Sequence, residues 1–536
     1  MAMKKHALPY ALLATTLFAV TALSACSEGG SKGANATVSP SASSAPAASA
    51  SAKPKAPEKV YIYDIGLATS LGKSSKPEAV KKVQQIVLEQ TGIEIVTVPR
   101  SADSPNEKLN LLLASNDPLD LFVGTMEQHQ VNGAAMPLND LLNKYGSNIR
   151  KQWRSDWSIG WDALTTPDGK IWGIPTNMAN SGNLVLVRKD WLDKLKLPQP
   201  TTMEELETVL QAFKDKDPAG NGQTIPLLTD YNPSAGLNGM NGALAGGFMD
   251  VGYGDFLDTD GKVKKVVYNP GYKTFVGAMA DWYKKGLIYK ESFALNRDRQ
   301  NELIKQNRVG AAAIYQTLMG GTNLNELRKV APEAEYVALD LKGPKGIAAS
   351  RGSASRSGIM LNKNSKNPEA AMRLLDWIFS DIKNYFLLFF GIENDNWKYL
   401  DKSKNQVQIR LNYDYLGDLL PFTTLAYTMQ SVIVTEAPLP GKVDYSDYLI
   451  KNVQFNPSKS KAYGIATVDY QFDRKAISGK VPMMADIDRT IDQEIVKFVM
   501  GARPMAEYDK FLAELSKAGH DTLSAVLTEE YNKFKK

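Results

Sequence analysis

The chain has 536 residues, of which 43% are hydrophobic and 23% are charged. This length exceeds what one hydrophobic core organises, so we expect more than one lobe. A formal net charge of +5 is small for this size and excludes the strongly basic composition of nucleic-acid-binding proteins. With a single cysteine, the chain cannot form an internal disulfide framework.

The first 57 residues predict an export signal followed by a tether. Lys4 and Lys5 precede an apolar stretch that ends at Leu23-Ser24-Ala25-Cys26, which resembles a bacterial lipobox. Residues 1–25 are therefore expected to be a lipoprotein signal peptide, with Cys26 as the lipid attachment site. Residues 26–57 are rich in Ser, Ala and Pro, a composition that predicts a disordered tether with a reach of about 30 Å.

Strands and helices alternate after the tether. Residues 59–66 predict a strand, 77–90 a helix with apolar residues at helical spacing, and 93–98 a second strand after Gly92. Residues 109–114 and 119–124 repeat this pattern. Alternation of this kind predicts an α/β lobe with a largely parallel sheet.

Several later segments carry turn and cap signals. Asp168-Gly169 predicts a hairpin before a strand over 171–174, and residues 183–188 predict another strand. Thr202 and Glu205 have the spacing of a capping box, which predicts a helix to about Lys214. The apolar run 385–390 is too short to span a membrane and is expected in a core.

The motifs of common enzymes are incomplete. The glycines of Gly66-Leu67-Ala68-Thr69-Ser70-Leu71-Gly72-Lys73-Ser74 are separated by five residues, whereas a phosphate loop has four. Beyond the signal, only His129 and His520 could serve a histidine-based triad or zinc site. We therefore expect a protein that is not an enzyme. The alternative of a glycoside hydrolase stays open, because its paired carboxylates come from distant parts of a chain and have no characteristic spacing.

Several segments together identify a family resemblance over nearly the whole mature chain. They are the lipobox, Asn116-Asp117-Pro118-Leu119-Asp120-Leu121-Phe122, Asp168 to Pro175, Leu186 to Leu195, Ser365 to Trp377, Phe390-Gly391-Ile392-Glu393 and Phe498 to Phe511. In this order they resemble the large, family-1 solute-binding lipoproteins of ABC importers, which include alginate-binding and maltose-binding proteins.

The resemblance implies a two-lobed α/β fold of the type II periplasmic-binding-protein kind, in which lobes joined by hinge crossovers close on a ligand. We place the crossovers near residues 175–184 and 345–355. The first lobe is then expected over 58–178 and 352–400, and the second over 179–351 and 401–536.

The same family implies a possible calcium loop after the helix that starts at Thr202. Asp217 and Asn221 match an EF-hand-like loop found in some of these proteins. However, Ala219 replaces one oxygen ligand, and the closing Asp-Glu pair is missing. The alternative is a helix-terminating turn without an ion. No other cofactor is expected.

An oligosaccharide is the expected ligand, because the family mostly binds such sugars and the chain has 8 Trp and 23 Tyr. Open α/β sheets place ligands at loops that follow strands. By this rule the predicted ligand-binding residues are Glu127, Gln128, Asn177, Asn180, Tyr231, Tyr315, Arg351 and Trp397. Arg351 and its neighbour Arg356 would suit a uronic-acid sugar, or they could lie on the surface or brace the hinge.

The expected function is a receptor held on the extracytoplasmic face of the cell membrane by its lipid. As a monomer it would deliver an oligosaccharide to the permease of an ABC transporter. Two alternatives remain at this point. A receptor or sensor lipoprotein for peptides or other solutes would share the fold, and an exported glycoside hydrolase would share the compartment.

Overall fold

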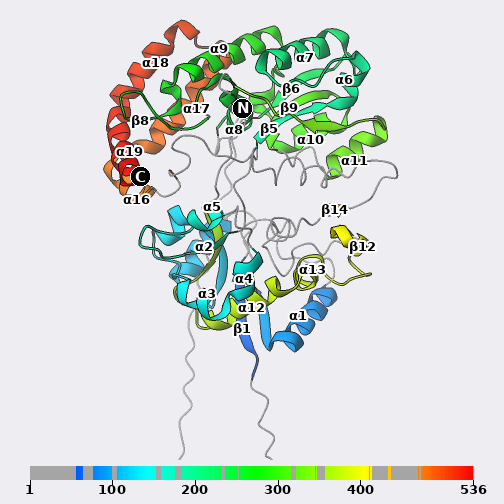
Figure 1. Ribbon diagram of the computed structural model, residues 1–536, viewed down its shortest axis with the longest axis vertical. Coiled ribbons are helices and arrows are strands. Elements are labelled where there is room, and N and C mark those ends of the chain that lie inside the picture. Colours follow the sequence, from blue (N-terminus) through cyan, green and yellow to red (C-terminus); the bar gives the residue numbers. More distant parts are fainter. Residues whose placement is uncertain are drawn as a thin grey trace, which may run out of the picture. The chain divides into compact units, whose positions relative to one another are not determined.

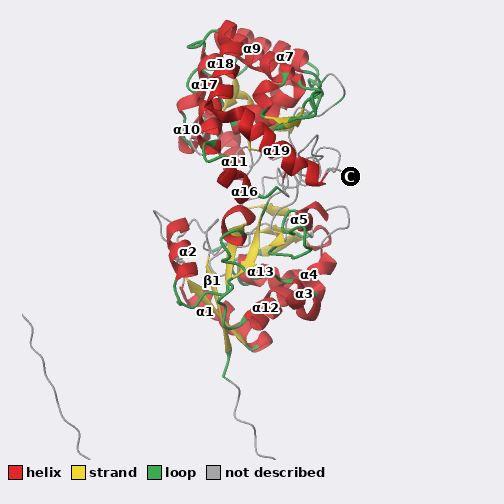
Figure 2. Cartoon of the chain, turned by 90° about the vertical axis from the view of Figure 1, so that its left-hand side faces the viewer, coloured by secondary structure: helices red, strands yellow, loops and turns green. Residues whose placement is uncertain are grey.

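The computed structural model describes most of the chain after the tether, and all described residues belong to the unit Ala56–Lys536. Two sheets, each with helices on both faces, organise this unit (Figures 1 and 2). The described residues are 56–63, 77–98, 105–152, 158–175, 183–220, 222–230, 236–251, 253–315, 321–343, 346, 356–409, 411–412, 433–435, 469 and 472–534.

The first sheet has five strands in the order β2-β1-β3-β11-β4. β1 pairs in parallel with β2 and β3, whereas β11, which returns late in the chain, runs antiparallel to β3 and β4. The expectation of a largely parallel sheet therefore holds for the strands that come first in the chain. The strands are β1 (Glu58–Tyr63), β2 (Ile93–Val98), β3 (Leu121–Thr125), β4 (Ile174–Pro175) and β11 (Ser357–Leu361).

Strand periodicity divides the core of the first lobe between the two faces of this sheet. Ile62 and Leu121 join one buried cluster, and their neighbours Tyr63 and Phe122 join the cluster on the opposite face. Helices cover both clusters, and Figure 2 shows α3, α4 and α12 side by side. The helices are α1 (Pro77–Thr91), α2 (Pro105–Ala114), α3 (Asn139–Tyr145), α4 (Ser147–Gln152), α5 (Ser158–Asp162), α12 (Pro368–Ser380) and α13 (Ile382–Phe390).

The second sheet has four strands in the order β10-β5-β9-β6. β6 and β9 are parallel, and β5 is antiparallel to both β9 and β10. The burial of every residue of β6 explains its continuous apolar character, because helices pack on both faces. The strands are β5 (Asn183–Arg188), β6 (Ile225–Thr229), β9 (Val309–Tyr315) and β10 (Tyr336–Ala338).

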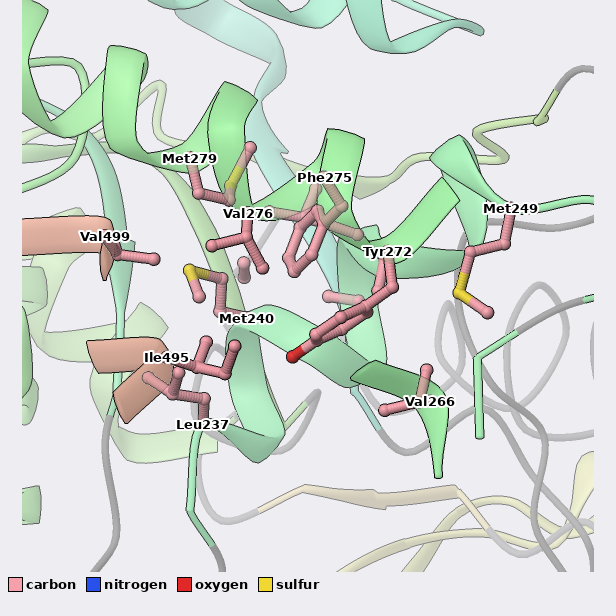
Figure 3. Close-up of a cluster of buried hydrophobic side chains, with 14 of the residues drawn as sticks. Leu237, Met240, Met249, Val266, Tyr272, Phe275, Val276, Met279, Ile495 and Val499 are labelled. Atoms are coloured by element: carbon pink, nitrogen blue, oxygen red, sulfur yellow. The ribbon is translucent and has the colours of Figure 1, made fainter. Parts of the chain in front are cut away.

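Helices from distant parts of the chain share the core of the second lobe. In Figure 3, Met240 of α8 and Ile495 and Val499 of α17 lie against the apolar side of α9, which carries Val276 and Met279. Burying such side chains contributes roughly 1.5–3 kcal/mol each. The helices are α6 (Lys189–Leu195), α7 (Met203–Lys216), α8 (Asn238–Leu244), α9 (Pro270–Lys285), α10 (Arg297–Lys305), α11 (Gly321–Val330), α16 (Arg474–Lys480), α17 (Met484–Met500), α18 (Tyr508–Leu515) and α19 (Asp521–Phe534).

The remaining elements are short. Two further sheets consist of β7 (Phe256–Leu257) with β8 (Val263–Lys264), and of β12 (Lys398–Asp401), β13 (Gln406–Gln408) and β14 (Ile433–Thr435). The short helices are η1 (Met126–Gln130), η3 (Ala245–Phe248), η4 (Val266–Tyr268), η5 (Ser292–Ala294), η7 (Lys402–Lys404), η11 (Met505–Glu507) and η12 (Ser516–His520). Within the described part of the chain, no helix is long and apolar enough to cross a membrane.

Most predicted elements agree with the structure. The strand over 183–188 has the predicted bounds. The capping box is also present: the Thr202 side chain accepts a hydrogen bond from the backbone N–H of Glu205, and the Glu205 side chain accepts one from the backbone N–H of Thr202. The hairpin signal is also confirmed, because Gly169 has a φ of +80° between the bridged residues Thr165 and Ile171. The observed strand β4 covers Ile174–Pro175 and shares only Ile174 with the predicted 171–174 strand, so it is shorter and later than expected.

The first core extends past the predicted lobe boundary at residue 400. Val407 and Ile409 belong to the same buried cluster as Val60 and Ile359. Hydrophobic pattern alone did not show which sheet these residues cover, because their cluster combines residues from distant parts of the chain.

A buried arginine braces the second sheet. Nε and Nη2 of Arg188 donate to the two carboxylate oxygens of Asp190 at 2.8 and 2.6 Å, and Nη1 donates to Oδ1 of Asn307 at 2.6 Å. The guanidinium also lies 4.4 Å from the ring centre of Trp191. Arg188 is fully buried, and these partners satisfy the charge that burial would otherwise leave isolated.

Candidate functional site

Polar side chains gather at one end of the second sheet. The parallel strands β6 and β9 finish at Thr229 and Tyr315, so Asp230 and Tyr315 lie at the same edge. β5 runs the opposite way and begins there, with Asn183 paired to Tyr315. Three separate segments thus place a carboxylate, an aromatic ring and an amide at one edge.

Asp230 is half-buried, and its surroundings are unusually tight. A Cβ on Gly239 would lie 2.0 Å from Oδ1 of Asp230, so only glycine permits this close approach. The backbone N–H of Gly239 donates to the carboxylate. Burial raises the pKa of Asp230, while the positive charge of Arg297 at the start of α10 acts in the opposite direction.

Tyr315 offers its ring at this edge. Its side chain is 41% exposed, although its neighbours along β9 are buried. Burial around the hydroxyl raises the pKa of Tyr315, and Arg297 opposes this shift. The ring can therefore stack on an apolar ligand face while the hydroxyl takes part in hydrogen bonds.

At the first sheet, η1 follows the carboxyl end of β3 and carries Glu127 and Gln128. The Thr125 side chain caps this turn by accepting from the backbone N–H of Gln128 at 3.3 Å. Nε2 of Gln128 donates to Oδ1 of Asn110 at 3.3 Å. Both predicted residues thus lie at a strand edge, as the sequence indicated.

Glu127 is paired with an arginine that returns from a distant segment. Because β11 is antiparallel to β3, Arg356 lies beside this turn, and its carbonyl accepts from the N–H of Met126 at 3.0 Å. Nε of Arg356 lies 2.6 Å from Oε1 of Glu127. Glu127 and Arg356 thus form an ion pair, and Nε and Nη1 of Arg356 are buried without a hydrogen-bond partner in the described structure.

His129 is buried and stabilises this turn. Its Nδ1 accepts from the N–H of Thr125 at 2.9 Å, and its ring packs 5.3 Å from the ring of Phe122, centre to centre. Burial lowers the pKa of His129. The histidine is therefore a neutral structural acceptor that positions the strand end.

The prediction that Trp397 binds ligand is not supported by its position. The side chain is only 2% exposed, packs edge-on to Phe386 and Tyr399, and donates its indole N–H to the carbonyl of Gly391 at 3.0 Å. Trp397 is a core residue of the first lobe. We correct the prediction accordingly, because neither its ring face nor its donor is free for a sugar.

Several predicted residues lie outside the described part of the chain, and the structure gives no geometry for them. They are Cys26, Asn177, Asn180, Asn221, Tyr231 and Arg351. Asn177, Asn180 and Arg351 belong to the expected crossovers. Their roles stay predictions.

In the candidate calcium loop, protein groups donate hydrogen bonds to the carboxylate of Asp217. Asp217 caps α7 with a φ of 42°, and its Oδ2 accepts from the N–H of Gly222 at 2.7 Å. Its Oδ1 accepts from the hydroxyl of Thr224 at 2.5 Å. Among the described residues, no group of three or more His, Cys, Asp or Glu side chains is arranged to hold a metal. These contacts describe Asp217 as the cap that ends α7, and the predicted calcium site, whose second residue is Asn221, stays a prediction.

Sequence reasoning missed Asn183, Asp230 and Arg297. Asp230 follows its strand directly and precedes the predicted Tyr231, so the same rule could have found it. Asn183 begins an antiparallel strand, and the rule for carboxyl ends overlooks it. Arg297 starts a helix that no local signal connects to β6 or β9.

Comparisons with known proteins agree with this architecture. The model of a family described as bacterial extracellular solute-binding protein matches residues 70–384. Over 499 residues the chain is 25% identical to the fructooligosaccharide ABC transporter substrate-binding protein FusA of Streptococcus pneumoniae, covering 86% of this chain and 88% of that protein. It is 23% identical to the polygalacturonan/rhamnogalacturonan-binding protein YtcQ of Bacillus subtilis, covering 83% of this chain and 86% of that protein.

Solved structures show the same fold. The crystal structure of the alginate-binding protein AlgQ2 without calcium ion matches with a TM-score of 0.57 at 21% identity, covering 89% of this chain and 98% of that one. The sequence prediction of a type II, two-lobed α/β fold is thereby confirmed.

Proposed function

The chain belongs to the bacterial extracellular solute-binding proteins, and we propose that it captures an oligosaccharide and delivers it to the permease of an ABC importer. Relatives that match most of the chain are named for binding fructooligosaccharide or polygalacturonan. In this proposal, ligand contacts from both lobes form together, so that binding stabilises a conformation that the permease recognises.

The cluster of Asp230, Tyr315 and Asn183 is the observation that carries the proposal. A sugar presents hydroxyl groups around its rim and C–H groups on its faces. The Asp230 carboxylate accepts from hydroxyls, the Asn183 amide both donates and accepts, and the exposed ring of Tyr315 stacks on a C–H face. At the first sheet, Glu127, Gln128 and Arg356 provide further donors and acceptors.

We propose that the ligand leaves unchanged, with no bond made or broken. His129 is buried as a structural acceptor behind the first edge. Glu127 lies 2.6 Å from Arg356, and the positive charge of Arg297 acts on Asp230. This environment suits the binding of hydroxyl groups.

We further propose that the protein is a monomer anchored outside the cytoplasm through a lipid on Cys26, with residues 26–57 as its tether. The support is the lipobox-like sequence and the family's extracellular place. Cys26→Ser should release the protein from the membrane fraction into the medium or periplasm. A variant that stays in the membrane fraction would contradict the lipid anchor.

Binding experiments on two variants test the proposed site. Hydrogen bonds to a charged group contribute about 1.5–3 kcal/mol, so Asp230→Asn should weaken oligosaccharide binding by about tenfold to 100-fold. Tyr315→Ala should lower the affinity about tenfold through loss of ring contact. Asp258→Asn is a matched control, since this half-buried carboxylate pairs with Lys264 in the β7–β8 hairpin. Wild-type affinity in both edge variants would refute the site.

A further inference from the structure

Each candidate edge combines an acid with an arginine among its described residues, namely Glu127 with Arg356 and Asp230 with Arg297. The charges around these groups bear on which class of oligosaccharide the site takes, and this inference rests on the proposed function.

Arg356 has acidic neighbours inside the protein. Glu127 is in direct contact with it at 2.6 Å. Burial lowers the pKa of Arg356, while Asp469 and Asp473, like Glu127, favour its charged form and Arg474 opposes it. Three carboxylates therefore act on a group of two guanidiniums. An incoming carboxylate would add a fourth negative charge to this group.

The donors of Arg356 are nevertheless incompletely used. Its side chain is 16% exposed, and Nε and Nη1 have no hydrogen-bond partner among the described residues. Buried donors without partners are costly. A sugar hydroxyl that meets the exposed part of the Arg356 side chain brings an oxygen to this edge without adding charge, and the same hydroxyl can donate to the carboxylate of Glu127.

The edge of the second sheet leads to the same conclusion. Asp230 is half-buried against Gly239, whereas Arg297 lies on an exposed helix start. A ligand that approaches this edge meets the carboxylate in a poorly hydrated setting. A second carboxylate at that position would be repelled, because like charges interact strongly where water is excluded.

From these observations we infer that the cargo is a neutral oligosaccharide, whose hydroxyls bind to the Glu127–Arg356 pair and to Asp230, and that uronic-acid sugars are rejected. Arg356 therefore donates to sugar hydroxyls and does not bind a uronate, contrary to what its residue type had suggested. The negative charge of Glu127 determines this selectivity.

Calorimetric titration of the protein with neutral and with acidic sugars tests the inference. The probes are neutral fructo-, malto- and galacto-oligosaccharides, and oligogalacturonates and alginate oligomers. We expect a neutral probe to bind at least about 100-fold more tightly than any acidic one. The affinity for it should change little between about 50 mM and about 500 mM salt, because screening acts on charged partners. Tighter binding of an acidic probe would overturn the inference and leave the proposed function intact, whereas binding of neither class would refute both.

Glu127→Gln tests the role of the pair directly. Loss of this charge leaves Arg356 uncompensated, so the preference for neutral over acidic sugar should fall at least about tenfold. Glu369→Gln is the matched control, because this exposed acid pairs with Lys144 at 3.1 Å away from the strand edges. Thermal unfolding of both variants verifies folding. A folded Glu127→Gln variant with unchanged preference would contradict the assignment.

Discussion

Arg188→Met should strongly destabilise the protein. The change removes a fully buried guanidinium that makes two hydrogen bonds to Asp190 and one to Asn307. Met retains much of the apolar stem, but it leaves the carboxylate of Asp190, itself 10% exposed, without its cation. Breaking a buried ion pair in this way costs about 3–5 kcal/mol. Because domains are stable by about 5–15 kcal/mol, the loss is a large share of the total.

Urea unfolding followed by circular dichroism and tryptophan fluorescence measures this loss. Lys189→Met is the matched control, since Lys189 is the next residue and its ion pair with Asp193 is exposed. Such surface pairs contribute about 0–1 kcal/mol. The double variant Arg188→Met, Asp190→Leu should recover part of the loss, because no unpaired charge remains. If Arg188→Met loses less than about 1 kcal/mol, like its control, the reasoning from the buried pair is wrong.

Three further predictions concern the core, pH and metal. Trp397→Ala should cost about 3–5 kcal/mol of stability, because the side chain is buried, and the folded fraction should bind sugar with unchanged affinity. A variant that keeps full stability but loses affinity would show that Trp397 binds ligand. Burial lowers the pKa of both His129 and His520, so stability should be complete above about pH 6.5 and fall as pH drops through their folded pKa values. Replacing both histidines with Gln should reduce the fall of stability with decreasing pH, measured by urea unfolding at several pH values. An unchanged pH dependence would mean that other groups cause it. Chelation should leave the melting temperature unchanged, because Ala219 replaces one oxygen ligand of the loop and the closing Asp-Glu pair is missing. A drop that calcium reverses would show a bound ion.

Local signals predicted much of the fold. The continuous apolar run from Leu184 to Val187 defined β5, and the Thr202–Glu205 spacing defined the start of α7, because both depend on neighbours in sequence. Trp397 shows the limit of such signals. The rule for loops that follow strands selected it as a ligand-binding residue, but the contacts with Phe386 and Tyr399 make it core.

The candidate site was predicted in part, for a related reason. The rule that ligands lie at strand ends found Glu127, Gln128 and Tyr315, which stand directly after or at the end of a strand. The partner of Glu127 is Arg356, which lies 229 positions later and directly before the antiparallel strand β11, and no local pattern specifies this pairing. Such contacts follow from topology, which the sequence does not display.

The central claim is that this protein binds an oligosaccharide and releases it unchanged. Thermal unfolding with neutral and acidic oligosaccharides and with peptides, followed by mass spectrometry of the recovered sugars, tests it most directly. A ligand at 100 times its dissociation constant adds about 2.7 kcal/mol and raises the melting temperature visibly. We predict a rise with an oligosaccharide that is recovered intact. Cleaved sugar, or a rise with peptides alone, would contradict the account.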